Sequence, residues 1–378
     1  MKKSVPFNRA TVAFNQKKYV LESMKSGYLS GDGEFTKRAS RHLSGIHKGS
    51  KVLLTTSCTS ALEMCAILLD IKNGDEVIVP SYTFVSSANA FVLSGAKIVF
   101  VDIDKATWNI DPELVEHAIT PRTKAIVAVN YAGHSAVSAE LMRISKRSGI
   151  PIVEDNAHGL FAEKDKCPLG TTSAMSTLSF HETKNVTCGE GGALVLNDPS
   201  LLEIAEIVRE KGTNRSKFFR GMVDKYTWIE KGSSYVLSDV NAAILLAQLE
   251  DSSNIQKRRQ NTFDTYMKNL TDWALQCGAQ LPVHLNTRES SYHMFPIVMP
   301  DLDSRTRLIN LTKDLGVNLV FHYIPLHSSP GGKRFGISHN DCPNTNFISD
   351  RLVRLPLFSD IKRNEIEKVV EAVQCFRN

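Results

Sequence analysis

The chain predicts an α/β fold in which a mostly parallel sheet, covered by helices on both faces, is joined to a smaller α/β domain. Over roughly the first 250 of the 378 residues, short apolar runs alternate with helical segments, a repetition typical of βαβ units. The runs are apolar throughout, as expected of strands that are buried on both faces. Near residue 252 this pattern gives way to a longer helical segment, so we expect a second domain from there.

The elements of the large domain follow from this pattern, and the domain is predicted over residues 1–251. Four apolar runs are expected to be buried strands, at 51–54, 76–79, 97–101 and 124–129. Helical segments separate them, among them 61–69 and 137–147. Three later runs are also expected to be strands, at 151–154, 174–180 and 193–196.

The smaller domain is predicted over residues 252–378. Its first element is a helical segment that ends near residue 275. After it the sequence indicates a mixed region, in the order strand 294–299, helix 305–315, strand 317–322 and helix 364–375.

Composition and charge argue against several classes of protein. Hydrophobic residues make up 42% and charged residues 22% of the chain, which is ordinary for a globular protein. The net charge of +5 suits anionic small molecules, whereas a nucleic-acid protein more often shows a concentrated basic stripe. The one dense basic stretch, 209–225, is interpreted either as a solvated loop or as an anion-binding segment.

The cysteines and the apolar stretches indicate the cellular setting. Seven cysteines are scattered along the chain without a C-x-x-C pair, which predicts reduced thiols and no disulfide framework or metal site. The apolar stretches are too short to span a bilayer, and residues 1–8 lack the apolar core of a signal peptide. We therefore expect a cytoplasmic protein that has no membrane or nucleic-acid partner.

Asp155 and Lys184 are the candidate catalytic residues. Asp155 closes the predicted strand 151–154, where a buried carboxylate is costly unless it meets a positive group, such as a pyridinium, an arginine or a helix start. Lys184 lies between two predicted strands and is followed by the glycines 189, 191 and 192. Burial lowers the pKa of a lysine toward the range in which its free amine attacks carbonyls. This pair has the layout that a pyridoxal phosphate (PLP) enzyme needs.

Weaker signals surround the pair. Ser60 and Glu63 have the spacing of a capping box, and the same exposed N–H groups at a helix start also suit a phosphate. Phe84 follows a predicted strand at the edge where ligands gather, although a phenylalanine is more often a core residue. His158 either faces a cofactor or is a structural histidine. Neither G-x-G-x-x-G nor a Walker motif occurs, which disfavours dinucleotide- and NTP-binding proteins.

Nearly the whole chain resembles the DegT/DnrJ/EryC1/StrS family of sugar aminotransferases, which have the fold-type I PLP architecture. The resemblance rests on the motifs at 6–8, 30–36, 80–84, 153–159, 179–185, 209–215 and 321–327. Within the family, the segment 218–228 is most similar to the transaminases that form dTDP-4-amino-4,6-dideoxyhexoses for enterobacterial surface polysaccharides such as lipopolysaccharide O-antigen.

The resemblance assigns roles residue by residue. It implies that Lys184 forms the Schiff base and moves protons, and that Asp155 pairs with the pyridine nitrogen. It places the remaining cofactor contacts at His158 near the ring oxygen, at Phe84 against the ring, and at Thr59, Ser60 and Ser179 on the phosphate. The family's asparagine that reaches the neighbouring subunit's cofactor phosphate is replaced here by Ser234, and its usual glycine in the phosphate turn by Cys58.

We therefore expect a homodimeric aminotransferase whose active sites lie at the subunit interface. The resemblance implies transfer from L-glutamate to C4 of dTDP-4-keto-6-deoxyglucose, with either configuration at C4. The candidates for holding the diphosphate-sugar are Arg220, Lys225, Tyr323 and His327. Two alternatives stay open: a 3-aminotransferase acting on a 3-keto sugar, and a non-catalytic protein that only binds PLP or a nucleotide-sugar.

Overall fold

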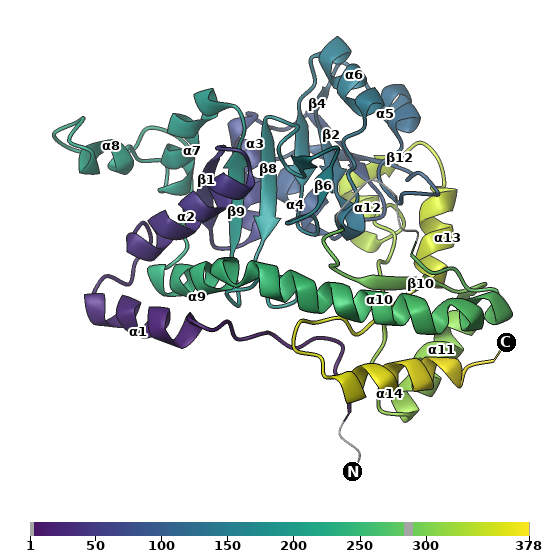
Figure 1. Cartoon of the computed structure of the whole chain (residues 1–378). Coiled ribbons are helices and arrows are strands. Elements are labelled where there is room, and N and C mark those ends of the chain that lie inside the picture. Colours follow the sequence, from purple (N-terminus) through teal and green to yellow (C-terminus); the bar gives the residue numbers. More distant parts are fainter. Residues whose placement is uncertain (1–3, 283–289, 378) are drawn as a thin grey trace.

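The computed structural model describes residues 4–282 and 290–377, and an eight-stranded sheet forms the centre of its N-terminal part (Figure 1). The strand order is β1-β9-β8-β5-β4-β2-β3-β12. Neighbouring strands from β8 to β12 are parallel, and β9 runs antiparallel to both of its neighbours. In sheet order the bounds are β1 Lys51–Thr55, β9 Gly192–Leu196, β8 Met175–Ser179, β5 Ile152–Asp155, β4 Thr123–Val129, β2 Glu76–Pro80, β3 Lys97–Val101 and β12 Gly336–Ser338.

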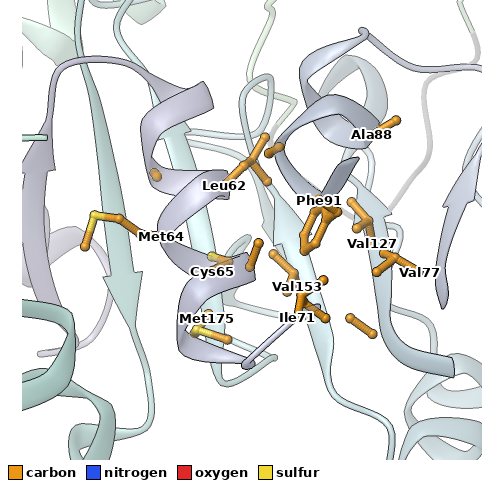
Figure 2. Packing of buried hydrophobic residues seen from close by; sticks show 14 of the residues in the cluster. Leu62, Met64, Cys65, Ile71, Val77, Ala88, Phe91, Val127, Val153 and Met175 are labelled. Atoms are coloured by element: carbon orange, nitrogen blue, oxygen red, sulfur yellow. The ribbon is translucent and has the colours of Figure 1, made fainter. Parts of the chain in front are cut away.

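Helices cover both faces of this sheet, because successive side chains of a strand point to opposite faces. Val77 and Val79 pack with one helical layer, while Ile78 between them packs with the other. Figure 2 shows the first layer, in which α3 and α4 bring Leu62 and Phe91 against the strands. This layer comprises α3 (Cys58–Leu68), α4 (Ser86–Leu93) and α7 (Leu202–Arg209); the other comprises α2 (Glu34–Ile46), α5 (Pro112–Ala118), α6 (Ala139–Ser148) and α9 (Asp239–Glu250), with α1 (Gln16–Ser26) packed on α9.

The predicted α/β architecture is confirmed, and all seven predicted strands of the large domain are present. Two short additions lie outside the main layers. The hairpin of β6 (Glu163–Lys164) and β7 (Cys167–Pro168) follows β5, and α8 (Arg215–Phe219) projects from the body with the residues after it (Figure 1).

The C-terminal part is built on a small antiparallel sheet with its own core. The order of its strands is β10 (Phe295–Val298), β13 (Leu352–Leu355) and β11 (Val320–Phe321). Three helices pack against this sheet: α10 (Ser252–Cys277), which extends from the large sheet to the C-terminal part in Figure 1, α11 (Leu302–Asp314) and α14 (Arg363–Gln374). Two further helices complete this part, α12 (Pro330–Phe335) and α13 (Pro343–Arg351).

The predicted strand at 317–322 is shorter in the structure. Only Val320 and Phe321 pair with β13, because the preceding residues pair instead with the N-terminal segment. Asn318 donates its backbone N–H to Val5, and Val5 donates its own to Gly316. The start of the chain thus completes the core of its C-terminal part.

The two parts of the chain are interleaved at one edge. β12 lies within the predicted small domain, yet it pairs in parallel with β3 and forms the outer strand of the large sheet. The division of the chain at residue 252, where α10 begins, therefore stays a proposal. Within residues 4–282 and 290–377, none of the helices combines the length and apolar character that a membrane span requires.

Candidate active site

A cavity of about 570 Å³ lies between the carboxyl ends of the central strands and the C-terminal part. The large domain contributes the end of β5, the start of α3 and the turn between β8 and β9. The C-terminal part contributes β13 and the loop that follows β11. Among the sequence-predicted site residues, the cavity is lined by Thr59, Phe84, Asp155, His158, Ser179, Lys184 and Tyr323.

Asp155 is the last residue of β5 and is 5% exposed. The Ser87 hydroxyl donates a hydrogen bond of 2.6 Å to its Oδ2, and the Ala157 N–H donates one of 3.2 Å to its Oδ1. The Ser87 hydroxyl is itself 2.8 Å from that of Thr83. These contacts hold a carboxylate in place at the floor of the cavity, where it can face a cationic group.

Lys184 lies in the turn between β8 and β9, where its backbone N–H bonds to the His181 carbonyl at 2.9 Å. Its amine has no hydrogen-bond or ion-pair partner among the described residues. Burial lowers the pKa of Lys184 to about 8, against the opposing influence of Cys58 and of the Asp155 carboxylate. A lysine in this state has an appreciable fraction of free amine near neutral pH, which suits attack on an aldehyde or ketone.

The start of α3 differs from the prediction. The capping box of Ser60 and Glu63 is wrong, because the helix begins at Cys58 and its N-cap is Ser57, whose hydroxyl accepts from the Ser60 N–H at 3.0 Å. The Ser60 hydroxyl instead lies 2.8 Å from that of Thr56 and does not line the cavity. The helix start itself still opens onto the cavity through Ser57, Cys58 and Thr59.

Two hydroxyls and one close backbone approach shape this helix start. The Thr59 hydroxyl lies 2.8 Å from that of Ser86, at the start of α4, and both residues line the cavity. Gly192 permits the approach of β9 to α3: a Cβ at this position would lie 2.3 Å from the Cys58 nitrogen and 2.4 Å from the Ser57 oxygen. The glycine predicted to follow the lysine turn therefore has a packing reason, since only glycine fits there.

Aromatic and imidazole rings also line the cavity. His158 is stacked on His293, with ring centroids 4.4 Å apart at an interplanar angle of 21°. Burial lowers the pKa of His158 well below its usual range, and its buried Nδ1 has no partner among the described residues. Phe84 is 56% exposed at the mouth of the cavity, and its ring centroid lies 6.1 Å from that of Tyr323.

These residues fit PLP. Lys184 presents an unpartnered amine for the aldehyde, and Asp155 presents a fixed carboxylate for the pyridine nitrogen. Ser57 and Thr59 at the start of α3 provide hydroxyls beside exposed N–H groups, which suits a phosphate. The unpartnered Nδ1 of His158 provides a further polar contact. The described residues include no group of three or more histidine, cysteine, aspartate or glutamate side chains that could hold a metal.

Three predicted site residues lie away from this cavity. Ser234 is exposed, and its backbone pairs with Glu210. Arg220 forms an ion pair with Glu206, and Lys225 is exposed in the segment after α8. Within one chain none of the three lines the cavity.

His327 is also directed elsewhere. Its Nδ1 lies 2.6 Å from the Ser81 hydroxyl, and it does not line the cavity. The structure therefore brings only Tyr323 of the predicted small-domain pair to the site.

The sequence analysis did not single out four residues at or beside the site: Ser87, His293, His322 and Arg354. His322 lies within the motif at 321–327, but no role was assigned to it. Arg354 carried a signal, since it is the one charge within the apolar run 352–357. Ser87 and His293 had none, because their places depend on how distant segments pack.

Comparison with known proteins identifies the family. The sequence profile of the DegT/DnrJ/EryC1/StrS aminotransferase family matches residues 11–374. The chain belongs to this family. It is 34% identical to the uncharacterised protein MJ1066 of Methanocaldococcus jannaschii over 335 residues, which cover 86% of each chain.

Solved structures of related proteins agree with this assignment. The aminotransferase TlmJ from Streptoalloteichus hindustanus is 28% identical and superposes with a TM-score of 0.89 over 98% of both chains. The putative sugar aminotransferase Spr1654 from Streptococcus pneumoniae in its PMP form is 26% identical, with a TM-score of 0.89 and the same coverage. PseC from Helicobacter pylori, an aminotransferase of pseudoaminic acid biosynthesis, is 25% identical with a TM-score of 0.86, again over 98% of both chains. The fold is that of the fold-type I aminotransferases, and the protein is a PLP-dependent aminotransferase.

Proposed function

We propose that this aminotransferase moves an amino group from L-glutamate to C4 of dTDP-4-keto-6-deoxy-D-glucose, giving a dTDP-4-amino-4,6-dideoxyhexose for surface polysaccharide. The observation that carries the proposal is the pairing, in one cavity, of the unpartnered Lys184 amine with the buried Asp155 carboxylate. A protein that only binds a nucleotide-sugar does not need a reactive amine, whereas the pKa of Lys184 is lowered to about 8.

The roles of the two residues follow from their surroundings. Bound PLP supplies an aldehyde that carries the amino group and a ring that accepts electrons. Lys184, as the free amine, takes the proton from the α-carbon of the donor; in the second half-reaction the same side chain, once protonated, delivers a proton to C4 of the sugar. Asp155, held by Ser87, would provide the negative charge that pairs with the pyridine nitrogen. The start of α3, with Thr59, and the nearby Ser179 would hold the phosphate.

The choice of a sugar substrate is supported by the family and by the cavity. The related structures include a putative sugar aminotransferase and an enzyme of pseudoaminic acid biosynthesis. The segment 218–228 is most similar to that of the dTDP-4-amino-4,6-dideoxyhexose transaminases. Tyr323 offers a ring face at the cavity on which a sugar can pack, near Phe84, which we propose to lie against the cofactor ring.

The contacts to the diphosphate are assigned to a homodimer with active sites at the interface. Arg220 and Lys225 lie on the projecting segment around α8, outside the cavity of their own chain. The same segment exposes Phe219, Met222 and Trp228, apolar side chains that a second copy can cover. We also propose that Ser234 and His327 lie near this interface. We place the reaction in the cytoplasm, where the free cysteines of the described chain stay reduced.

A product analysis tests the proposal. The protein is incubated with PLP, L-glutamate and dTDP-4-keto-6-deoxyglucose, and the products are identified by NMR. We expect 2-oxoglutarate and a 4-amino sugar, with the H3–H4 coupling reporting the configuration at C4. An amine at C3 from a 3-keto substrate establishes the 3-aminotransferase instead. Binding of PLP and the sugar without release of 2-oxoglutarate establishes the non-catalytic alternative.

A further inference from the structure

Arg354 is a charged residue on the inner strand of the small sheet. It lies in β13, between Val353 and Leu355, which are both fully buried in the core of the C-terminal part. Because side chains alternate along a strand, Arg354 faces the opposite way. There it lines the same cavity as Lys184 and Asp155.

The guanidinium of Arg354 has no acceptor. Within residues 4–282 and 290–377 no hydrogen bond or ion pair reaches it, and its Nε is a buried donor without a partner. Its central carbon lies 4.8 Å from the centre of the Phe7 ring, a cation–π contact that leaves the N–H donors unused. Two buried arginines do have acceptors for their terminal N–H groups: Arg259 donates to backbone carbonyls, and Arg209 donates two hydrogen bonds to Asp32, although the Nε of Arg209 is also without a partner.

The surroundings of Arg354 do not neutralise its charge. Burial lowers its pKa, and the groups that work against this loss are the hydroxyls of Tyr82, Tyr131 and Tyr323, which are neutral at ordinary pH. The imidazoles of His158, His293 and His322 are also near, since the charge of Arg354 helps to lower the pKa of each. A half-buried cation that has no anion among the described residues favours an anionic ligand.

We propose that Arg354 binds the α-carboxylate of the amino donor through its two-pronged guanidinium. This inference rests on the proposed function and adds the group that recognises the donor. A planar guanidinium matches a carboxylate with two parallel hydrogen bonds, a geometry that lysine cannot provide.

The position of Arg354 favours the donor carboxylate over the diphosphate of the sugar. Arg354 and Lys184 line the same cavity, and the charge of Arg354 contributes to lowering the pKa of that amine. In an amino acid the α-carboxylate is bonded to the very carbon that exchanges its proton with the lysine. In a 4-keto sugar nucleotide, the diphosphate is attached across the ring from the reacting carbon and lies farther from that amine.

A binding experiment tests this assignment without turnover. Glutarate, a dicarboxylate that carries no amine or ketone, is titrated calorimetrically into the PLP-loaded protein. We expect Arg354→Gln to weaken glutarate binding about 10- to 100-fold, the loss that follows from removing a hydrogen-bonded charge pair. The glutarate affinity of Arg354→Lys, which keeps the charge but not the two-pronged guanidinium, should lie between that of the wild-type protein and that of Arg354→Gln. Arg363→Gln is the matched control, because Arg363 is an exposed arginine on α14 that pairs with Glu367 far from the cavity.

Steady-state kinetics separate the two substrates. With Arg354→Gln we expect the KM for L-glutamate to rise about 10- to 100-fold while the KM for the keto-sugar changes by no more than about twofold. The preference for L-glutamate over 4-aminobutyrate, which lacks the α-carboxylate, should fall by a similar factor. An equal loss with both donors assigns Arg354 to the distal carboxylate and overturns the inference.

The remaining outcomes are also decisive. Unchanged glutarate binding by a variant that retains its PLP, measured by absorbance, overturns the inference. A loss of dTDP affinity in its place assigns Arg354 to the acceptor. If Arg354→Gln does not fold, the glutarate affinity of Arg354→Lys decides. If the wild-type protein does not aminate the keto-sugar but glutarate binding still depends on Arg354, the acceptor proposal fails and the donor site stands.

Discussion

The two walls of the cavity differ in how their charges are balanced. On the large-domain wall, Asp155 accepts hydrogen bonds from Ser87 and Ala157, and its charge is opposed by that of Lys184. On the C-terminal wall, Arg354 has no anion among the described residues, and the rings around it are neutral. The charges of the large-domain wall balance one another and can act on a bound cofactor. The charge of the C-terminal wall is balanced only when an anionic substrate binds.

The walls also differ in how the chain builds them. Asp155 and the lysine turn sit at the ends of adjacent strands, β5 and β8, whose register places their carboxyl ends at one edge. The C-terminal wall combines β13 with loops that come from three separate stretches of sequence. We therefore expect substitutions on the first wall to reduce chemistry and those on the second to reduce substrate binding.

The largest expected effect is that of Lys184→Ala. Without the amine that moves the protons, kcat should fall about 1,000-fold or more, since general acid–base groups contribute about 10²–10⁴. The measurement is the release of 2-oxoglutarate over many turnovers. Lys257→Ala, an exposed lysine on α10, serves as the control and should keep full activity. Full multiple-turnover activity of Lys184→Ala would mean that the lysine has been assigned wrongly.

Asp155→Asn should have the second-largest effect on kcat, because it keeps the shape of the side chain but removes its charge. Loss of one partner from a buried pair costs about 3–4 kcal/mol at the lower end of the measured range, so kcat should fall about 10²- to 10³-fold with little change in the KM for the sugar. Ser87→Ala removes only one hydrogen bond to this carboxylate and should cost about tenfold or less. A larger loss with Ser87→Ala than with Asp155→Asn would contradict the role of the carboxylate.

The pH dependence of the reaction of Lys184 with PLP is a further test of the large-domain wall. Because its pKa is lowered to about 8, the free amine increases about tenfold per pH unit below that value and levels off above it. The rate at which the cofactor-free protein captures PLP should rise in this way, as measured by borohydride trapping and mass spectrometry. An ordinary exposed lysine would continue to rise toward pH 10. Asp155→Asn should move the midpoint lower, since the carboxylate raises the pKa of this amine.

The smallest expected effect is at the helix start. Gly192→Ala places a Cβ against the backbone of Ser57 and Cys58, so the free energy of unfolding should fall by about 1–3 kcal/mol and PLP affinity should fall with it. Gly45→Ala in α2 is the matched control. A Cβ there meets nothing within 4 Å, and stability should rise by up to about 1 kcal/mol. Urea unfolding measures both, and equal effects of the two changes would contradict the proposed close approach.

Much of the large domain was predictable because its signals are local. Fully apolar runs indicate strands buried on both faces, and all seven predicted strands are present. Asp155 and Lys184 were found because each follows a strand in the same parallel unit. The start of α3 was placed three residues too late, since several residues of the stretch 55–60 have hydroxyls and the local pattern does not say which of them caps the helix.

By itself the sequence determined seven of the eight strands of the large sheet, the alternation of strands with helices and the pair of residues at the sheet edge, because these depend on short-range patterns of apolar and charged residues. Only the tertiary structure decided which distant groups complete the site. Ser87 in α4 bonds to Asp155, which lies 68 residues later in the chain, and Arg354 reaches the cavity from a strand some 200 residues after Asp155. Such contacts depend on how segments far apart in the sequence pack against one another, and no local pattern records that geometry.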